Sequence, residues 1–319
     1  MRILSGIRPS GTLHLGNYIG AIQQWLGLQR EHEVYYMVAD LHAITTPYDP
    51  KTFQAQIRDV VADYLAAGLD PKHATIFVQS HVPEHTQLMW VLSSLTPTGE
   101  LNRMTQYKDK LRGGALANAG LLTYPILMAA DILAYRAECG PVGEDQVQHV
   151  ELARDLAKRF NRMFGKTFPE PQPLLSQGKR IMSLKEPDKK MSKTNDDGIA
   201  LTDAPAVIQR KIAKAVTATR GGGTSAGVEN LFLMLRTFAE PNVVGRFERA
   251  ERDGAIKYAE LKTALAEAIV HHFAPFRKRR KEILADATAL DRVLTDGARR
   301  ARLIAGETLA AGYTTIGLR

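Results

Sequence analysis

Two short segments of this 319-residue chain carry residue types that bind phosphate groups, and the first of them is residues 9–17, Pro-Ser-Gly-Thr-Leu-His-Leu-Gly-Asn. It lies between an apolar run and a helical pattern, where backbone N–H groups and a helix dipole favour an anion. Gly11 and Gly16 let the main chain approach a bulky ligand. His14 and Asn17 add donors for charge that develops on a transferring phosphoryl group. Taken alone, the pattern is equally typical of a tight turn with a helix-capping histidine.

The second segment follows roughly 175 residues later and reads Lys189-Lys190-Met191-Ser192-Lys193-Thr194. Lysines with a hydroxyl between them can surround the outer phosphates of a nucleotide as mobile point charges. On its own, a lysine-rich loop is more often solvated surface. Together and in this order, however, the two segments resemble the paired HIGH and KMSKS signatures of the class I aminoacyl-tRNA synthetases, which implies an enzyme that activates an amino acid with ATP.

The segment from Tyr124 to Tyr135 predicts a helix with one acidic residue on an apolar face. Tyr124, Met128, Asp131 and Tyr135 follow spacings of four, three and four, so they share that face. A carboxylate among apolar side chains is costly unless it is paired. An apolar pocket with one acceptor fits indole, whose polar atom is an N–H donor. The alternative is a surface or ion-paired aspartate.

Further segments make the chain similar to the bacterial tryptophanyl-tRNA synthetases, and they are residues 5–11, 40–45, 99–106, 124–133, 142–146 and 180–184. The resemblance runs from about residue 3 to the C-terminus and weakens after residue 200. It implies a Rossmann catalytic domain, a helical anticodon-binding domain and a homodimer. The implied substrates are L-tryptophan, ATP with Mg²⁺ bound through its phosphates, and tRNA(Trp).

The resemblance also implies roles for individual residues. The tryptophan pocket would be lined by Tyr124, Met128, Asp131, Ile132, Val142 and Gln146, with His42 beside it. The residues implied for ATP are Arg8, Pro9, Ser10, Gly11, Gly16, Asn17, Gly143, Asp145, Ile181, Lys190, Met191, Ser192 and Lys193. Catalysis would depend on His14, Asn17, Lys190, Ser192, Lys193 and Lys110, the last reaching the pyrophosphate. No residue is expected to bind a metal directly.

Three positions depart from the pattern of these relatives: Arg8 stands where glutamine is common, Leu4 where an aromatic residue is common, and Gly140 where valine is common. Arg8 adds a positive charge close to the expected α-phosphate or substrate carboxylate, which would alter ATP affinity or the response to tryptophan-like inhibitors. The other two put the packing of the pocket in question.

The composition is that of a globular protein, with 45% hydrophobic and 24% charged residues. A net charge of +8 favours a polyanionic partner without deciding it. The single cysteine, Cys139, excludes an intrachain disulfide framework and is interpreted as a small buried hydrophobe in a reducing compartment. With no long apolar span and no signal peptide, we expect a cytoplasmic protein with no membrane partner.

Short apolar runs alternate with helical patterns in the first half of the chain. Residues 3–7, 34–39 and 75–79 predict buried parallel strands, and helices are expected at 18–28, 52–67, 84–95, 124–135 and 146–160. This alternation predicts an α/β fold with a doubly wound, Rossmann-type sheet and a helical C-terminal domain. After the proline-rich residues 169–173 the composition shifts, which places a catalytic domain at 1–185 and a helical anticodon-binding domain at 186–285, with the KMSKS-type loop at its start. A helix within 286–319 is expected to pack back on the first domain.

Alternative functions stay open at this point. A tyrosyl-tRNA synthetase shares both nucleotide motifs but needs polar partners for a phenol oxygen. A small nucleotidyltransferase would lack the basic helical C-terminal half, and a non-catalytic paralogue that binds RNA would not need the lysine motif. The basic run at residues 277–281 is equally typical of a tRNA phosphate contact and of a solvated helix face.

Overall fold

The computed structural model describes residues 1–114, 116–175, 181–191, 198–217 and 225–318. These residues fall into two compact units. The first unit contains residues 1–10, 25–176 and 286–319, and the second contains residues 11–24 and 177–285. The second unit therefore includes residues 11–24, which the expected domain division counts with the sheet.

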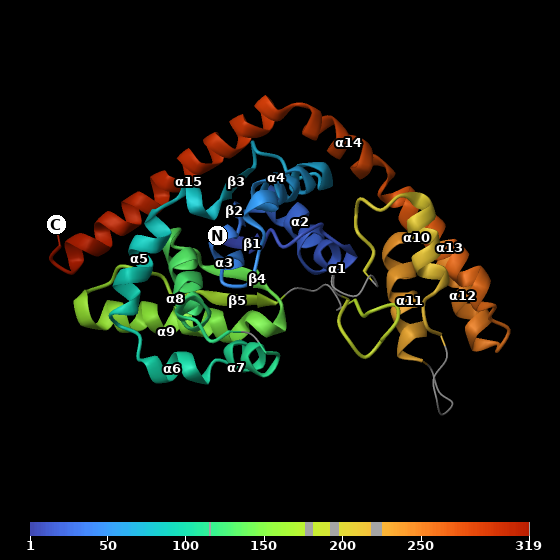
Figure 1. The fold of residues 1–319 in the computed structure, drawn as a ribbon, viewed down its shortest axis with the longest axis horizontal. Coiled ribbons are helices and arrows are strands. Elements are labelled where there is room, and N and C mark those ends of the chain that lie inside the picture. Colours follow the sequence, from blue (N-terminus) through green and yellow to red (C-terminus); the bar gives the residue numbers. More distant parts are fainter. Residues whose placement is uncertain (115, 176–180, 192–197, 218–224, 319) are drawn as a thin grey trace. The chain divides into compact units, whose positions relative to one another are not determined.

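Five parallel strands form the sheet of the first unit, in the spatial order β3-β2-β1-β4-β5 (Figure 1). The strands are β1 (Arg2–Ile7), β2 (Glu33–Val38), β3 (Ala74–Val78), β4 (Cys139–Val142) and β5 (Gln172–Leu175). This confirms the predicted doubly wound sheet. The order reverses between β1 and β4, and sheets of this kind bind ligands at the carboxyl ends of the strands near that point.

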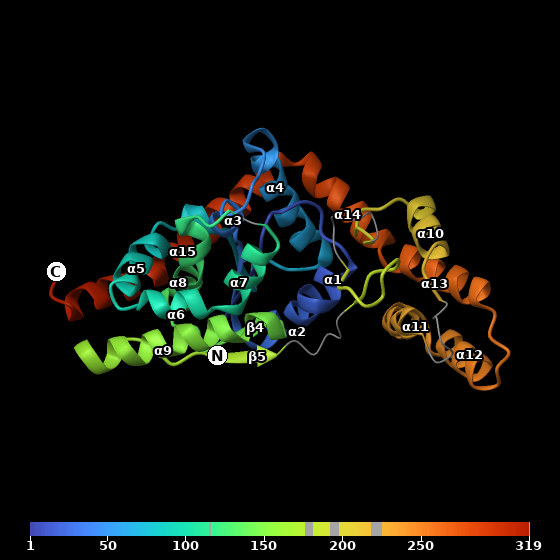
Figure 2. The same cartoon turned by 60° about the horizontal axis from the view of Figure 1, so that its bottom comes forward.

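Helices lie on both faces of this sheet. They are α2 (Gln23–Glu31), α3 (Asp40–Ala43), α4 (Pro50–Ala67), α5 (Glu84–Ser93), α6 (Thr98–Arg103), α7 (Thr105–Arg112), α8 (Ala119–Ala134), α9 (Val147–Phe164) and α15 (Ala287–Thr315), with short 3-10 turns η2 (Gln79–His81) and η3 (Glu144–Gln146). Both views show α8 beside α5 and α9 (Figures 1 and 2).

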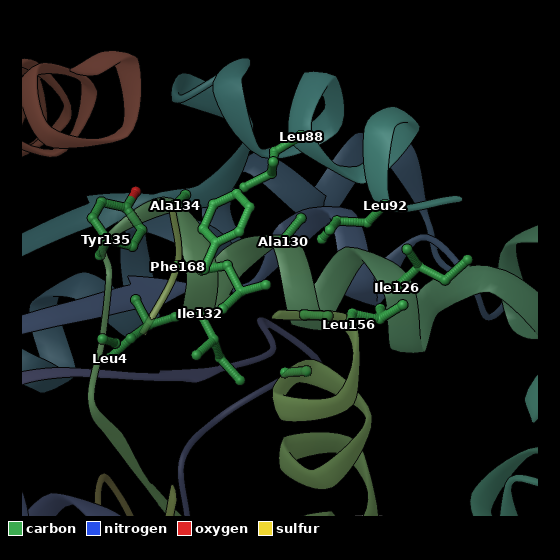
Figure 3. Packing of buried hydrophobic residues seen from close by; sticks show 14 of the residues in the cluster. Leu4, Leu88, Leu92, Ile126, Ala130, Ile132, Ala134, Tyr135, Leu156 and Phe168 are labelled. Carbon is green, nitrogen blue, oxygen red and sulfur yellow. The ribbon is translucent and has the colours of Figure 1, made fainter. Parts of the chain in front are cut away.

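Successive strand residues point to opposite faces, so each face has its own core. On one face, Leu4 and Phe77 pack with apolar side chains of α5, α8, α9 and α15. Figure 3 shows side chains of α5 and α8 gathered around Phe168 in this cluster. On the other face, the Trp25 ring of α2 stacks on Tyr36 of β2 with centroids 4.5 Å apart. β2 and β3 are buried on both sides in this way, which is why they are continuous apolar runs in the sequence.

The long helix α15 packs against β3, the edge strand of the sheet (Figure 1). Gly297 makes this approach possible, because a Cβ atom built there would lie 1.8 Å from the backbone oxygen of Ile76. Arg300 adds a hydrogen bond of 2.8 Å to the backbone oxygen of Pro71. Covering β3 removes one exposed edge at which another strand could pair.

The second unit is helical in its described part. Its helices are α1 (Leu15–Asn17), the π-helical turn η1 (Tyr18–Ile22), α10 (Pro205–Ala213), α11 (Ala226–Phe238), α12 (Pro241–Arg252), α13 (Tyr258–His272) and α14 (Ala274–Ala285). Residues 11–24 join this unit because their backbone pairs with residues 199–201. In addition, the Tyr18 ring packs on Phe273, with centroids 4.9 Å apart, and its hydroxyl lies 3.1 Å from His272 Nε2.

Several expected and observed elements differ. The strands β4 and β5 are absent from the expectation, and each is short and contains a proline, Pro141 or Pro173, which lacks the N–H that a ladder requires. The short helices α6 and α7 are also absent from it. The helix expected at 18–28 begins as the π-helical turn η1 and continues directly into α2, which ends at Glu31.

Candidate active site

Asp131 lies inside the first unit, with only 1% of its surface exposed. Its carboxylate accepts hydrogen bonds from Gln79 Nε2, at 2.8 and 3.0 Å, and contacts His42 Nε2 at 2.7 Å. Nδ1 of His85 contacts the other side of the same carboxylate. Burial by itself raises the pKa of the Asp131 carboxyl, but electrostatic interactions and hydrogen bonds with His85 and His42 outweigh burial and hold the pKa well below its usual range. Asp131 is therefore an ionised, buried acceptor.

The other residues predicted on this helix, those of the helix face together with the expected pocket residue Ile132, divide into two groups. Tyr124 and Met128 are half-buried on the helix that carries Asp131, and the Tyr124 ring lies 6.2 Å from the His42 ring, centroid to centroid. Ile132 and Tyr135 instead point into the core cluster and are buried (Figure 3). The accessible part of this face therefore consists of Tyr124 and Met128, with the buried acceptor next to them.

Tyr124 has a buried partner, His149 of α9, whose Nε2 lies 2.9 Å from the tyrosine hydroxyl. Burial, with a smaller contribution from the charge of His42, lowers the pKa of His149 to about 4. Burial likewise raises the pKa of Tyr124 to about 12. Both groups are therefore uncharged near neutral pH, and this contact orients the Tyr124 ring.

Two cations lie near Tyr124. The Lys110 ammonium of α7 lies 4.7 Å from the centroid of the Tyr124 ring, a cation–π contact. Burial and the charge of Arg8 both lower the pKa of Lys110, and Arg8 also lowers that of Tyr124. Arg8 follows β1 directly and is exposed, together with Ser10, while Pro9 between them is buried. Two positive charges beside an aromatic ring suit a carboxylate or a phosphate group.

The segment that follows β4 carries Gly143, Asp145 and Gln146 at the start of α9. Asp145 is exposed, and its Oδ2 accepts a hydrogen bond of 2.8 Å from Gln146 Nε2. A Cβ atom at Gly143 would lie 2.8 Å from Asp145 Oδ1, so a side chain at 143 would displace this carboxylate. The side chain of Val142, which was expected in the tryptophan pocket, lies outside the described residues.

In the second unit, the His14 motif forms a capping box at the start of α1. His14 Nδ1 accepts a hydrogen bond of 3.0 Å from the Gly16 N–H, and Asn17 Oδ1 accepts one of 3.1 Å from the His14 N–H. The turn needs both glycines, because Gly11 has φ +98° and a Cβ at Gly16 would lie 2.8 Å from the imidazole. His14 thus has the helix-capping role that the sequence left open. Because Nδ1 accepts in this cap, a neutral imidazole carries its hydrogen on Nε2, a donor that suits a phosphate oxygen.

The lysine motif belongs to the same unit. Lys190 is exposed and pairs with Met182 in an antiparallel bridge, and the Met191 N–H donates to the backbone oxygen of Ile181 at 3.0 Å, with both of these side chains buried. Ser192 and Lys193, to which catalytic and ATP-binding roles were assigned, lie outside the described residues.

The chain that follows the lysine motif pairs with the His14 motif. The Leu15 N–H donates to the Ile199 oxygen at 3.0 Å, and the Leu201 N–H donates to the Leu13 oxygen at 2.9 Å. Residues 199–201 are therefore held against the His14 turn.

Sequence reasoning did not identify Gln79, His85 or His149. Gln79 directly follows β3, and a polar side chain at the carboxyl end of a buried strand is a usable signal. His85 and His149 lie within helices, and no local pattern distinguishes them from surface residues. Each is 0% exposed and meets its partner only through the tertiary fold.

The remaining positions noted in the sequence have simpler environments. Leu4 lies in the core cluster, so its departure from an aromatic residue changes packing around α8. Cys139 is buried in β4, and burial, followed by the charge of Glu138, raises the pKa of its thiol, consistent with a packing role. In the basic run, Arg277 donates a hydrogen bond of 2.7 Å to the Val270 backbone oxygen within the helical unit.

No helix among the described residues is long and apolar enough to cross a membrane. Within the same described ranges, no group of three or more His, Cys, Asp and Glu side chains could hold a metal ion.

Comparison with known proteins gives consistent results. Residues 1–274 match the family described as tRNA synthetases class I (W and Y). The chain is 47% identical to tryptophan–tRNA ligase 2 of Streptomyces avermitilis, over 99% of this chain and 96% of the relative, and 46% identical to tryptophan–tRNA ligase of Clostridium tetani, over 99% and 95%. Its structure is similar to that of Campylobacter jejuni tryptophanyl-tRNA synthetase complexed with ADP and tryptophan, with a TM-score of 0.89, 33% identity, and coverage of 99% of this chain and 100% of the other.

Proposed function

Because the chain belongs to the tryptophan–tRNA ligases of the class I tRNA synthetase family, we propose that it activates L-tryptophan with ATP to tryptophanyl-adenylate and transfers the amino acid to the 3′ end of tRNA(Trp). The crystallised relative that is complexed with ADP and tryptophan supports both small substrates. Tyrosyl-tRNA synthetases share the family model, but the relatives that are 46–47% identical over nearly the whole chain are tryptophan–tRNA ligases.

The observation that carries the substrate assignment is the buried Asp131 carboxylate beside Tyr124 and Met128. An ionised carboxylate only accepts hydrogen bonds, and indole has one polar group, an N–H donor. A site built around such a pair discriminates strongly against phenylalanine, because phenylalanine has no N–H to donate to the carboxylate. A phenol oxygen both donates and accepts, and would need a further donor there.

The proposed chemistry needs no protein nucleophile. The tryptophan carboxylate attacks the α-phosphorus of ATP, a new C–O–P bond forms, and pyrophosphate leaves with the electron pair of the broken P–O bond. The tRNA 3′-terminal ribose hydroxyl then attacks the acyl carbon and displaces AMP. Positioning and charge stabilisation carry such transfers.

The phosphates of ATP are assigned to His14, Asn17 and Lys190, together with Ser192 and Lys193 beyond the described residues. Lys110 and Arg8 are assigned to the substrate carboxylate or the pyrophosphate, which their positive charges beside Tyr124 support. The donors in the two motifs are mainly nitrogens, which suit phosphate oxygens, whereas Mg²⁺ prefers oxygen ligands. Mg²⁺ is therefore proposed to enter bound to ATP rather than to protein side chains.

A homodimer and a cytoplasmic location are part of the same proposal. Both rest on the family, and the location also follows from the need to charge tRNA where translation takes place. We also propose, on the basis of the family, that the sheet-containing part carries out catalysis and that the helical part binds the anticodon. For the basic run at 277–281, the side chains of Lys278, Arg279 and Lys281 are exposed, which suits contact with RNA phosphates.

Amino-acid-dependent pyrophosphate exchange tests the function directly. With all twenty amino acids, we expect exchange with tryptophan to exceed that with tyrosine by several orders of magnitude; better exchange with tyrosine would refute the proposal. Lys193→Ala should slow exchange about 100- to 1000-fold, the scale of losing one preorganised donor. Asp131→Asn should lower kcat/KM for tryptophan, while Asp155→Asn, on an exposed carboxylate of α9, serves as the matched control and should leave it unchanged.

A further inference from the structure

The two oxygens of the Asp131 carboxylate have different surroundings. Oδ1 contacts His85 and Gln79, whose side chains are both 0% exposed. Oδ2 contacts Gln79 and also His42, the one of these three partners with an exposed fraction, 11%. The Oδ1 side of the carboxylate is therefore closed by buried side chains, whereas the partly exposed His42, with the Tyr124 ring beside it, lies on the Oδ2 side. Among the described residues, the Oδ2 side is thus the one that a ligand would approach.

A carboxylate has no intrinsic preference that would keep Oδ2 on the open side. The terminal torsion of aspartate is broad, so rotation about it is restrained only by external contacts. The contact of His85 with Oδ1 is such a restraint, because it comes from a separate helix, α5, and from a side chain that is itself completely buried.

His85 is in turn held by Tyr135, whose hydroxyl lies 2.7 Å from His85 Nε2. Burial, followed by the charge of Asp131, raises the pKa of Tyr135 well above its ordinary value, so the phenol keeps its proton. Since ionised Asp131 only accepts, His85 Nδ1 must carry a hydrogen, and a neutral imidazole then accepts the Tyr135 proton on Nε2. The His85 tautomer with its hydrogen on Nδ1, which donates to Asp131, is thus the one that the Tyr135 hydroxyl stabilises.

Tyr135 is itself immobilised by packing. Its ring stacks on Tyr35 of β2, with centroids 4.6 Å apart, and lies 5.6 Å from the Phe77 ring of β3. The series Tyr135, His85, Asp131 therefore connects the sheet to the carboxylate through buried side chains that contact one another.

Building on the proposed function, in which Asp131 accepts the indole N–H, we propose that His85 is a positioning residue for tryptophan recognition. His85 fixes the rotation of the Asp131 carboxylate so that Oδ2 faces the indole nitrogen, and the Tyr135 hydroxyl fixes the tautomer of His85. Neither side chain touches the substrate. Their effect is therefore on selection for the indole N–H rather than on the chemical step.

The test measures this selection as a ratio. The ratio is kcat/KM for L-tryptophan divided by kcat/KM for β-(3-benzothienyl)alanine, in which sulfur replaces the N–H, both from pyrophosphate exchange. His85→Leu should lower the ratio about ten- to a hundredfold, the scale of losing an oriented hydrogen bond. The loss should lie in the tryptophan value, with the analogue value and the KM for ATP unchanged.

Three further variants complete the design. His85→Asn keeps a donor near the position of Nδ1 and should restore most of the ratio. Tyr135→Phe removes only the hydroxyl and should lower the ratio by a smaller factor than His85→Leu does. His73→Leu, at an exposed histidine, is the matched control and should leave the ratio unchanged.

The outcomes separate the two proposals. If Asp131→Leu, which removes both acceptor oxygens, keeps the full ratio, the assigned role of Asp131 fails, and the role of His85 fails with it. If Asp131→Leu lowers the ratio to about one but His85→Leu keeps it, only the positioning role is overturned. A purely structural role would lower thermal stability and the rates for both substrates equally, which leaves the ratio unchanged and also overturns the inference. If His85→Leu does not fold, an unchanged ratio in Tyr135→Phe overturns the positioning role of His85.

Discussion

Acidification should destabilise the first unit through one buried imidazole, that of His149. The side chain is 0% exposed, and its Nδ1 is buried without a hydrogen-bond partner among the described residues. Its Nε2 lies 2.9 Å from the Tyr124 hydroxyl, a contact that orients the ring. Burial lowers its pKa to about 4, from an ordinary value of 6.5. Protonation in the folded state would place an unpaired charge in the core, so the folded protein binds this proton more weakly than the unfolded chain does.

The sign of the effect follows from that difference. Because the folded pKa is depressed, the unfolded chain binds more protons between pH 6.5 and 4, and the free energy of unfolding falls as the pH is lowered through this window. The contribution of His149 is complete above about pH 7. Two pKa values separated in this way imply a loss of about 1.4 kcal/mol at pH 5.5 and about 2.5 kcal/mol at pH 4.5.

The assay compares the wild type with His149→Gln, which keeps a polar group near Nε2 but cannot titrate. Urea unfolding is followed between pH 8 and 4.5 by tryptophan fluorescence, since both tryptophans of the chain, Trp25 and Trp90, lie in the first unit. Other titrating groups, Asp131 included, are common to both proteins and cancel in the difference. The variant should be less sensitive to acid by the amounts given above. Parallel stability curves for the two proteins across this range would refute the assignment of a neutral buried imidazole.

Two further predictions concern glycines. Gly297→Ala should lower the free energy of unfolding by about 2 kcal/mol or more, since its Cβ would overlap a backbone oxygen of β3. Gly306→Ala, on the open side of the same helix, should instead raise the free energy of unfolding by up to about 1 kcal/mol. Equal effects of the two substitutions in urea unfolding would contradict the packing of α15 on the sheet. Gly11→Ala forces a Cβ into a turn with φ +98°, at a cost of about 1–2 kcal/mol. The substitution should raise the KM for ATP, but not the KM for tryptophan, in pyrophosphate exchange. A parallel rise in both KM values would show that the turn does not serve ATP specifically.

The sheet was predictable to the extent that its strands are apolar runs. β2 and β3 were expected because they are buried on both faces, and burial on both faces leaves a continuous apolar signal in the sequence. β1 is only partly buried, but its apolar residues Ile3 and Leu4 were enough to predict it. β4 and β5 carry no such signal, because each has four residues with a proline inside. Their pairing is specified by the strands and helices around them. Periodicity likewise predicted α4 and its stop at Gly68, which has φ +112°, but it did not predict a π-helical turn in the first long helix.

In the site, too, some features follow from neighbouring residues and others only from the tertiary fold. Asp131 was predictable because a carboxylate on an apolar helix face must be paired, and that requirement is visible from neighbouring residues alone. The donors that meet the requirement are not local: Gln79 and His85 lie 52 and 46 residues away in the sequence. Gln79 could have been found, since it ends a buried strand, whereas His85 is one polar residue of an ordinary helix. A sequence therefore shows that a buried charge needs donors, and the fold determines which side chains provide them. The precision with which the charge is held is consequently a property of those distant donors, so substitutions at His85 or Tyr135 should affect selectivity at a site that neither side chain touches.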